Sequence, residues 1–252
     1  MTSKFAVLGS PISHSLSPVL HKAAFGCSGI DASYEALELA SGLREFANSL
    51  DASWMGLSLT MPLKEEALDV ASQLHPLAIS TRSANTLVRQ EGTWLAYNTD
   101  VMGLQHAVKG LDFKSVGILG SGATARSAAV AFEDQNVRVW ARNTDKAAAI
   151  SQAYGAVVSS LDAVLNADLV ISTVPKGVIH ALADGRYDGI LLDAVYANSP
   201  VEGFSRSVSG LEMLLWQAAG QQRLFRGGAL EEPLSIEAEI VAAMRTALGM
   251  GE

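Results

Sequence analysis

The stretch VGILGSGATARSAAVAF, residues 116–132, decides the fold of this 252-residue chain. Its first four residues predict a buried strand, and the small residues at its end predict a helix. Between them, Gly120, Gly122 and Ala125 form the pattern G-x-G-x-x-A in the strand–turn–helix context of dinucleotide-binding domains. The first glycine permits a tight turn, the second lets a pyrophosphate approach the backbone, and the alanine allows close packing of helix on strand. The pyrophosphate would lie at the helix N-terminus, whose free N–H groups and dipole favour negative charge.

Small residues also serve ordinary helix–strand packing, so the cofactor prediction depends on the next strand, 137–141, and the sequence ARNTDK at its end. An NAD site usually has an acidic residue about 20 residues after the glycines, which accepts from the ribose 2′-hydroxyl. Arg142 holds that place, and a guanidinium can bind a 2′-phosphate bidentately, so the sequence favours NADP. A solvated cationic strand end is the structural alternative. The predicted cofactor-binding residues are Gly120, Ser121, Gly122, Ala123, Thr124, Ala125, Arg142, Asn143, Thr144, Lys146, Thr173, Val174 and Pro175.

Apolar runs and helical patterns alternate along the rest of the chain, which predicts the α/β class, with parallel sheets and helices on both faces. We expect two α/β units, over 1–100 and 101–209, with the C-terminal helices of 210–252 returning to the first. The expected strands are 4–8, 33–39, 54–59, 84–89, 94–97, 116–119, 137–141, 156–158, 169–173 and 190–194, and strands 84–89 and 94–97 are expected to pair across the turn at 90–92. The expected helices are 17–25, 41–50, 62–74, 101–108, 123–134 and 144–154, with Ser17 as the N-cap of the first.

Composition excludes several classes of protein. The 26 acidic against 18 basic residues give a net charge of −8, which argues against a nucleic-acid partner. The single cysteine, Cys27, allows no intrachain disulfide and fits a reducing cytosol, and the five histidines lack the paired spacing of metal ligands. No apolar run approaches the roughly 18 to 20 residues that span a bilayer. We therefore expect a cytoplasmic protein without a metal or a membrane partner, either a monomer or a homodimer.

Three polar residues of the first unit are candidates for chemistry. Lys64 falls in the first turn of the expected helix 62–74, where the helix dipole disfavours a cation. Such a placement suggests a functional constraint, although an ordinary surface lysine is the alternative. Asp100 follows a strand and could be a helix N-cap, and Asn85 could be a turn residue.

Six segments, taken in chain order, resemble shikimate dehydrogenase, the NADP-dependent enzyme family of aromatic amino-acid (chorismate) biosynthesis. The resemblance covers essentially the whole chain and implies an N-terminal substrate domain followed by a Rossmann-type NADP domain. The implied reaction is the reversible reduction of 3-dehydroshikimate to shikimate by NADPH. The segments are GSPISHSLSP (9–18), LTMPLK (59–64), SANT (83–86), NTDVMG (98–103), the glycine turn with ARNTDK (141–146), and GLEMLLWQA (210–218).

The resemblance also implies a role for each residue that matches a motif. Lys64 and Asp100 match the catalytic pair, with Lys64 as the acid that protonates the developing alkoxide and Asp100 as the group that keeps it charged and aimed. Whether Lys64 also acts as a base in the oxidative direction stays open. The implied substrate-binding residues are Ser15 and Ser17 at the carboxylate, Thr60, Asn85 and Gln217 at the ring hydroxyls, and Tyr196 near the carboxylate end.

Some positions depart from the family pattern. Ser58 stands where many members have asparagine, the glycine turn reads Gly-Ser-Gly-Ala where Gly-x-Gly-Gly is common, and YANSP (196–200) replaces the usual Tyr-Asn-Pro. Two alternatives follow from the same fold. A quinate or quinate/shikimate dehydrogenase often uses NAD, which Arg142 argues against, and a non-catalytic NADP sensor would lack Lys64 or Asp100, both of which are present.

Overall fold

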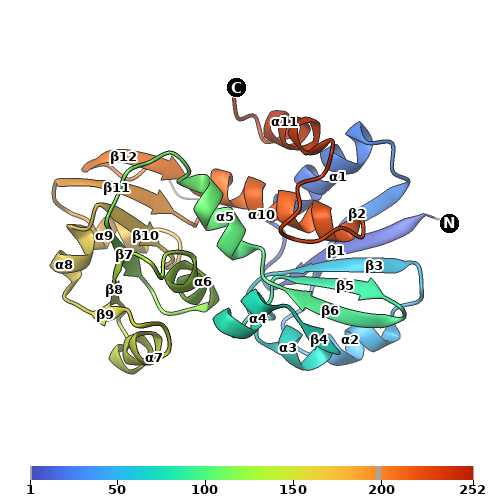
Figure 1. The fold of residues 1–252 in the computed structure, drawn as a ribbon, viewed down its shortest axis with the longest axis horizontal. Coiled ribbons are helices and arrows are strands. Elements are labelled where there is room, and N and C mark those ends of the chain that lie inside the picture. The colour runs from blue at the N-terminus through green and yellow to red at the C-terminus, as the bar shows by residue number, and fades with distance from the viewer. Residues whose placement is uncertain (1, 197–199, 252) are drawn as a thin grey trace. The chain divides into compact units, whose positions relative to one another are not determined.

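The structure is a computed structural model that describes residues 2–196 and 200–251. The chain divides into two compact units, one of Met1–Asp100 and Leu215–Glu252, the other of Val101–Leu214. Each unit contains a six-stranded sheet with helices packed on it, which confirms the predicted α/β class (Figure 1). Helix α5 (Asp100–Ala107) leads the chain into the second unit, and α10 (Gly210–Phe225) leads it back to the first.

The sheet of unit 1 has the strand order β2-β1-β3-β5-β6-β4. Strands β1, β2 and β3 are parallel, whereas β5 runs antiparallel to β3 and to β6, so the sheet is mixed. The expected hairpin of β5 and β6 is confirmed: Glu91 and Gly92 join the strands with φ values of 52° and 82°, as a two-residue hairpin turn requires. The elements are β1 (Ser3–Gly9), α1 (Ser17–Cys27), β2 (Ala32–Glu38), α2 (Leu43–Ser49), β3 (Trp54–Leu59), α3 (Glu66–Val70), β4 (Gln73–Leu74), α4 (Pro76–Thr81), β5 (Thr86–Gln90), β6 (Thr93–Tyr97), the C-terminal part of α10, and α11 (Glu237–Ala247).

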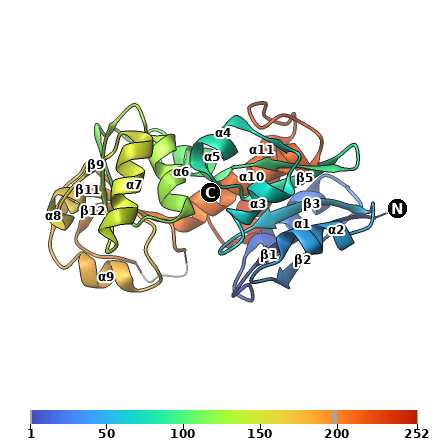
Figure 2. The same ribbon diagram turned by 90° about the horizontal axis from the view of Figure 1, so that it is seen from below.

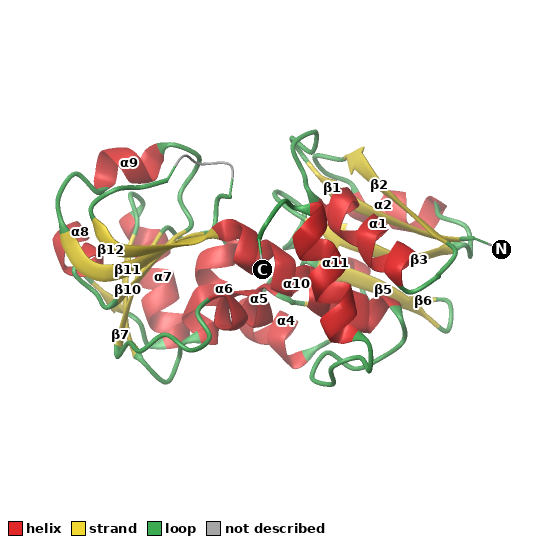
Figure 3. Ribbon diagram, turned by 90° about the horizontal axis from the view of Figure 1, so that it is seen from above, coloured by secondary structure: helices red, strands yellow, loops and turns green. Residues whose placement is uncertain are grey.

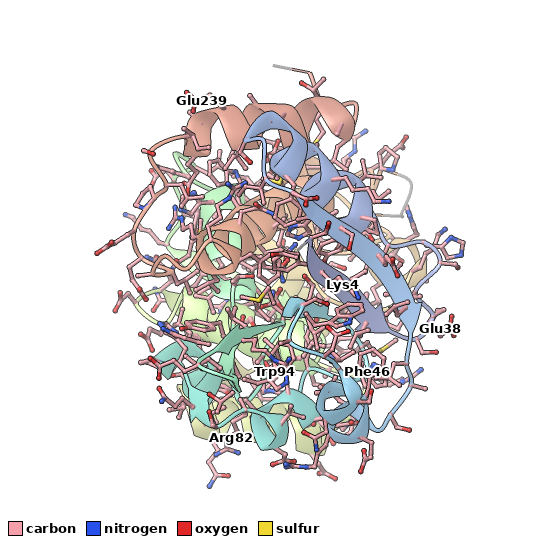
Figure 4. The ribbon with its side chains drawn as sticks, turned by 90° about the vertical axis from the view of Figure 1, so that its right-hand side faces the viewer. Lys4, Glu38, Phe46, Arg82, Trp94 and Glu239 are labelled. Atoms are coloured by element: carbon pink, nitrogen blue, oxygen red, sulfur yellow. The ribbon has the colours of Figure 1, made fainter. Side chains whose placement is uncertain are left out.

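Alternation along β1 builds two apolar layers in unit 1, because successive strand residues point to opposite faces of the sheet. Ala6 and Leu8 belong to one layer, which α2, α3 and α4 cover. Phe5 and Val7 belong to the other, beneath α1 and α10 (Figure 1). Trp94 and Phe46, labelled in Figure 4, are part of the first layer.

The sheet of unit 2 is wholly parallel, in the order β12-β11-β10-β7-β8-β9. Numbered within the unit, this is the 3-2-1-4-5-6 order of doubly wound dinucleotide-binding sheets, whose switch point lies between β7 and β10. Helices α8 and α9 cover one face, and Figures 2 and 3 show α7 on the face opposite α9. The elements are β7 (Ser115–Leu119), α6 (Ala123–Ala131), β8 (Asn136–Trp140), α7 (Thr144–Tyr154), β9 (Val157–Val158), α8 (Leu161–Leu165), β10 (Leu169–Ser172), α9 (Val178–Leu182), β11 (Tyr187–Asp193) and β12 (Phe204–Ser209).

The expected helix over 62–74 is wrong. Residues 61–65 form turns, and α3 occupies only Glu66–Val70, because Ala71 adopts an extended conformation and the chain then pairs with β6 as β4. Lys64 therefore lies in the turn before the helix and not, as expected, in its first turn. The prediction that Ser17 is an N-cap is also wrong, since Leu16 takes that place and Ser17 is the first helical residue.

Several short elements were not predicted: α4, α8, α9, β4 and β12. Two of these helices, α4 and α8, begin at a residue whose side chain caps the helix, which is a pattern that the local sequence displays. His75 caps α4 directly before Pro76, and Ser160 caps α8 through its hydroxyl. Across 2–196 and 200–251, we find no helix that combines the length and the apolar character needed to cross a bilayer.

Candidate functional site

The candidate substrate residues of unit 1 gather at one edge of its sheet. The chain leaves β1, β3 and β6 at this edge and enters β5 there, so four connecting segments meet. The first two of them are in close contact: the backbone N–H of Ser10 donates to the carbonyl of Met61 at 3.0 Å. A Cβ on Gly9 would lie 2.3 Å from Thr60 Cγ2, which explains the glycine at the start of the first motif. Both segments contain a cis proline, Pro11 and Pro62.

Lys64 and Asp100 form an ion pair at this edge, with 2.6 Å between Nζ and Oδ2. The side chains are 14% and 5% exposed, so little water competes for the pair. The backbone of Lys64 is fixed as well, because its carbonyl accepts from the N–H of Ala84 at 2.7 Å. Asp100 is the first residue of α5, and its N–H donates to Asn98 Oδ1 at 2.9 Å. A carboxylate and an ammonium held this way can position and deliver a proton.

Asn85 is held at the centre of the same edge by bonds to both ends of its amide. Its Nδ2 donates to Asp100 Oδ1 at 2.8 Å, to Thr99 Oγ1 at 2.9 Å and to Gln217 Oε1 at 3.2 Å. Its Oδ1 accepts from the N–H of Thr99 at 2.8 Å and from Thr86 Oγ1 at 2.9 Å. Asn85 is 2% exposed and Gln217 is 8% exposed. The structure thus brings together Lys64, Asp100, Asn85 and Gln217, although they come from distant parts of the chain.

The candidates for the substrate carboxylate lie on the segment after β1. Ser17 is buried at the start of α1, and its N–H donates to Ser15 Oγ at 3.3 Å. Thr60 directly follows β3, where its N–H donates to the carbonyl of Leu8 at 2.9 Å. Ser15, Ser17 and Thr60 therefore follow neighbouring parallel strands. Tyr196 belongs to unit 2, whereas the other five substrate candidates belong to unit 1.

Beneath the same edge lies a buried polar cluster that the sequence did not reveal. His21 Nε2 is 3.0 Å from Gln221 Oε1, and Gln222 Nε2 is 2.8 Å from His21 Nδ1. The His21 ring stacks on Tyr34 with 4.3 Å between ring centroids. Burial lowers the pKa of His21 to about 3 against the opposing hydrogen bond from Gln221, and burial raises the pKa of Tyr34. Both rings are therefore neutral in the folded protein near neutral pH.

In unit 2, the glycine turn lies at the switch point of the parallel sheet. Gly120 has φ = +120°, and a Cβ there would lie 2.2 Å from Thr173 Oγ1, so only glycine fits. The Thr173 hydroxyl donates to the carbonyl of Leu119 at 2.9 Å and ties together the ends of β7 and β10. This is the crevice where doubly wound sheets bind their ligands.

The space above the turn fits an anionic ligand. Gly122 is the N-cap of α6, and a Cβ built on it meets nothing within 4 Å. The N–H groups of the first helical turn, from Ala123 onward, have no partners within the helix and point out of its N-terminus. Ser121 and Thr124 flank the same backbone.

The predicted 2′-phosphate residues follow β8. Arg142 and Lys146 are exposed, and Asn143 caps α7 by accepting the N–H of Lys146 at 3.0 Å. Thr144 is the first helical residue. Because this strand end carries a guanidinium where an NAD site usually has a carboxylate, it fits a phosphate better than a ribose diol.

The remaining cofactor candidates follow β10 and β11. Val174 is buried in the apolar layer under α8 and α9, so only its backbone is available to a ligand, whereas Pro175 is exposed. Tyr196, with Asp193, lines a cavity of 240 Å³ at the carboxyl ends of β11 and β12. Residues 197–199 of the YANSP segment lie outside the described residues.

Comparisons with known proteins found matches in both units of the chain. The family model described as "Shikimate dehydrogenase substrate binding domain" matches residues 7–87, and one described as "NADP oxidoreductase coenzyme F420-dependent" matches 115–195. A relative from Ignicoccus hospitalis named "Shikimate dehydrogenase (NADP(+))" is 31% identical, with 89% of this chain and 94% of the relative covered.

Solved structures show the same similarity over the whole length. The shikimate dehydrogenase of Mycobacterium tuberculosis has a TM-score of 0.83 and 36% identity, with 98% of both chains covered. The shikimate 5-dehydrogenase of Thermus thermophilus, solved with NADP(H) and shikimate, has a TM-score of 0.82 and 28% identity, with 98% of this chain and 100% of that chain covered. From its sequence, its fold and these relatives, the chain belongs to the shikimate dehydrogenase family.

Proposed function

We propose that this protein catalyses the reversible reduction of 3-dehydroshikimate to shikimate by NADPH. The observation that carries the proposal is the ion pair of Lys64 and Asp100, fixed by Asn85 at the edge of the unit 1 sheet. A complete catalytic pair argues against a non-catalytic sensor. The relatives named for this activity and the complex with NADP(H) and shikimate support the assignment.

Unit 1 is the proposed substrate domain. Asn85 and Gln217 offer amide groups, and Thr60 a hydroxyl, for the ring hydroxyls of shikimate. Ser15 and Ser17 offer hydroxyls for its carboxylate at the start of α1, an eleven-residue helix whose first N–H groups also favour an anion. Tyr196 is proposed at the carboxylate end as well. Neutral hydroxyls bind the carboxylate without the desolvation of a buried arginine.

Unit 2 is the proposed NADP domain. The open backbone at Gly122 and the first turn of α6 would hold the pyrophosphate, with Ser121, Ala123, Thr124 and Ala125 along the same turn. Arg142, with Asn143, Thr144 and Lys146, would hold the 2′-phosphate. Thr173, Val174 and Pro175 would contact the nicotinamide end beyond β10. When bound, the cofactor supplies the hydride for the carbonyl carbon.

The protein's own task is then to manage one proton. Lys64 Nζ donates a proton to the developing alkoxide oxygen in the direction of reduction. Asp100 holds the Lys64 side chain through the 2.6 Å contact and keeps Nζ aimed at the reacting oxygen. In the direction of oxidation, the same nitrogen must receive the proton from the shikimate hydroxyl.

The test is a comparison of Lys64→Ala with the wild type in the oxidation of shikimate by NADP+. We expect kcat to collapse, because the proton donor and acceptor is gone, while shikimate still binds with a modest loss of affinity in a calorimetric titration. Lys22→Ala, on the exposed surface of α1, is the matched control and should behave like the wild type. Near-normal turnover of Lys64→Ala would refute the acid role.

A further inference from the structure

Five buried residues of unit 1 form a continuous series of hydrogen bonds, which we call the buried relay. The Tyr34 hydroxyl donates to Ser58 Oγ at 2.6 Å, and Ser58 Oγ donates to Gln221 Oε1 at 2.9 Å. Gln221 Nε2 donates to Thr86 Oγ1 at 3.0 Å, and Thr86 Oγ1 donates to Asn85 Oδ1 at 2.9 Å. The relay therefore begins at β2 and ends at the amide that touches the candidate catalytic pair.

Two oxygens that can only accept hydrogen bonds, the Asn85 carbonyl and the Asp100 carboxylate, fix which group donates at each step of the relay. Gln221 Nε2 also donates to the backbone carbonyl of Asn85 at 3.1 Å, so a flipped Gln221 amide would set two oxygens against each other. At the far end, Asn85 Nδ2 donates to the carboxylate of Asp100 at 2.8 Å. Asn85 Oδ1 must therefore face the Thr86 hydroxyl. Every donor in the relay thus has one acceptor that leads toward Asp100.

The position of Gln221 in α10 links the relay to the substrate candidates. Gln221 lies one helical turn after Gln217, and both side chains point to the same edge of the sheet, where Gln217 Oε1 accepts from Asn85 at 3.2 Å. Gln221 is 1% exposed, so its side chain is not accessible for direct contact with a substrate. All four hydrogen-bonding sites of its amide are occupied, since His21 Nε2 also donates to Oε1.

We propose that Gln221 is a positioning residue, which orients the Asn85 amide through the Thr86 hydroxyl and thereby holds Asp100 and Lys64 in their reactive arrangement. The inference rests on the proposed dehydrogenase function. The residues of the relay are buried, so no water can replace a lost hydrogen-bond partner. Leaving one of these amides without its partner therefore costs free energy. Ser58, one of the positions that depart from the family pattern, donates the hydrogen bond that holds Gln221 Oε1.

The test measures kcat, KM for shikimate, and the pH profile of kcat for Gln221→Met, Thr86→Val and Thr86→Ser. We expect Gln221→Met and Thr86→Val each to lower kcat about ten-fold, or about 1.4 kcal/mol at the transition state. The fall in kcat should exceed any rise in KM, and the pH at which kcat is half-maximal should shift, since the charged pair is less well held. Thr86→Ser keeps the hydroxyl and should recover most of the rate.

Two further variants separate positioning from packing. The double variant Gln221→Met/Thr86→Val should lose no more rate than either single variant, because both interrupt one relay. Gln222→Met is the matched control: Gln222 is as deeply buried on the same helix, but its amide bonds His21 Nδ1 and Arg226 Nε and not Thr86. It should lose stability to urea while keeping its kcat and pH profile.

Three results would overturn the inference. One is an unchanged kcat and pH profile in Gln221→Met and Thr86→Val while the wild type is active. Another is an equal loss in Gln222→Met, which would mean that packing alone is responsible. Absence of turnover by the wild type itself would contradict the proposed function, and the relay would lose its role with it.

Discussion

His21 should make the protein less stable in mild acid, by an amount that follows from its burial. The ring is fully buried between Tyr34 and the α10 glutamines, and its pKa falls from 6.5 to about 3. In the unfolded chain, the ring binds a proton near its ordinary pKa, while the folded protein keeps it neutral. The unfolded state therefore binds more protons between these two values, so stability rises with pH across that window and is complete above about pH 7.

The same linkage gives the magnitude. Between about pH 7.5 and about pH 5, protonation of His21 in the unfolded chain alone should remove about 2 kcal/mol from the free energy of unfolding. At still lower pH the loss approaches the full depression of the pKa, about 5 kcal/mol. Other titrating groups add a background that a variant without the imidazole shares. His21→Gln is that variant, because its amide can still donate to Gln221 Oε1 but does not titrate.

The assay is urea unfolding followed by tryptophan fluorescence at both pH values. Wild type should lose about 2 kcal/mol more than His21→Gln on going from the higher to the lower pH, whatever their difference at the higher pH. Equal losses for the two proteins would refute the reasoning, since His21 would then have the same proton affinity in both states. A larger loss for the variant would contradict it as well.

Three other sites have substitutions with definite expected outcomes: the 2′-phosphate site, the Arg223–Glu237 ion pair and the glycine turn. Arg142→Ala should sharply lower the preference for NADP over NAD in kcat/KM, because the guanidinium would bind the 2′-phosphate; an unchanged ratio would leave that role without support. Arg223→Met should lower the free energy of unfolding by about 3 kcal/mol, because Glu237, which Arg223 bonds bidentately at 2.6 and 2.7 Å, has a side chain only 13% exposed and would lose its cation. The added change Glu237→Met should restore much of this loss in urea titrations. Gly122→Ala should keep the melting temperature but weaken NADPH binding in a fluorescence titration. Gly120→Ala should lower the melting temperature, because its backbone would be strained and its Cβ would clash with Thr173. Equal melting temperatures of the two variants would contradict the geometry of the turn.

The parts of the fold that local chemistry decides could be predicted from the sequence. The strand, turn and helix around Gly120 and Gly122 depend on neighbouring residues, and both the glycine turn and the parallel sheet around it are present. The helix over 62–74 failed for the opposite reason. Its pattern of apolar residues is helical, but pairing of Gln73–Leu74 with β6 ends the helix at Val70. Contacts with a distant strand thus override local propensity.

The candidate site shows the same division. Four of the candidate residues lie in recognisable sequence motifs, and the structure brings their side chains together: Lys64, Asn85, Asp100 and Gln217. The buried cluster beneath them does not follow from any local pattern, because His21 and Gln221 are 200 residues apart in the chain. Because the histidine and the glutamine lie on different helices, no sequence motif or spacing predicts their contact. The local signal that exists is the pair of glutamines, Gln217 and Gln221, one helical turn apart in α10.

This chain should oxidise shikimate with NADP+ through its own pair of Lys64 and Asp100. The most direct measurement is a four-way steady-state assay of the purified protein, with shikimate or quinate against NADP+ or NAD+, following reduced nicotinamide by absorbance. We predict turnover chiefly with shikimate and NADP+. Turnover dominated by quinate or by NAD+, or none in any combination while NADPH still binds, would contradict the proposed function.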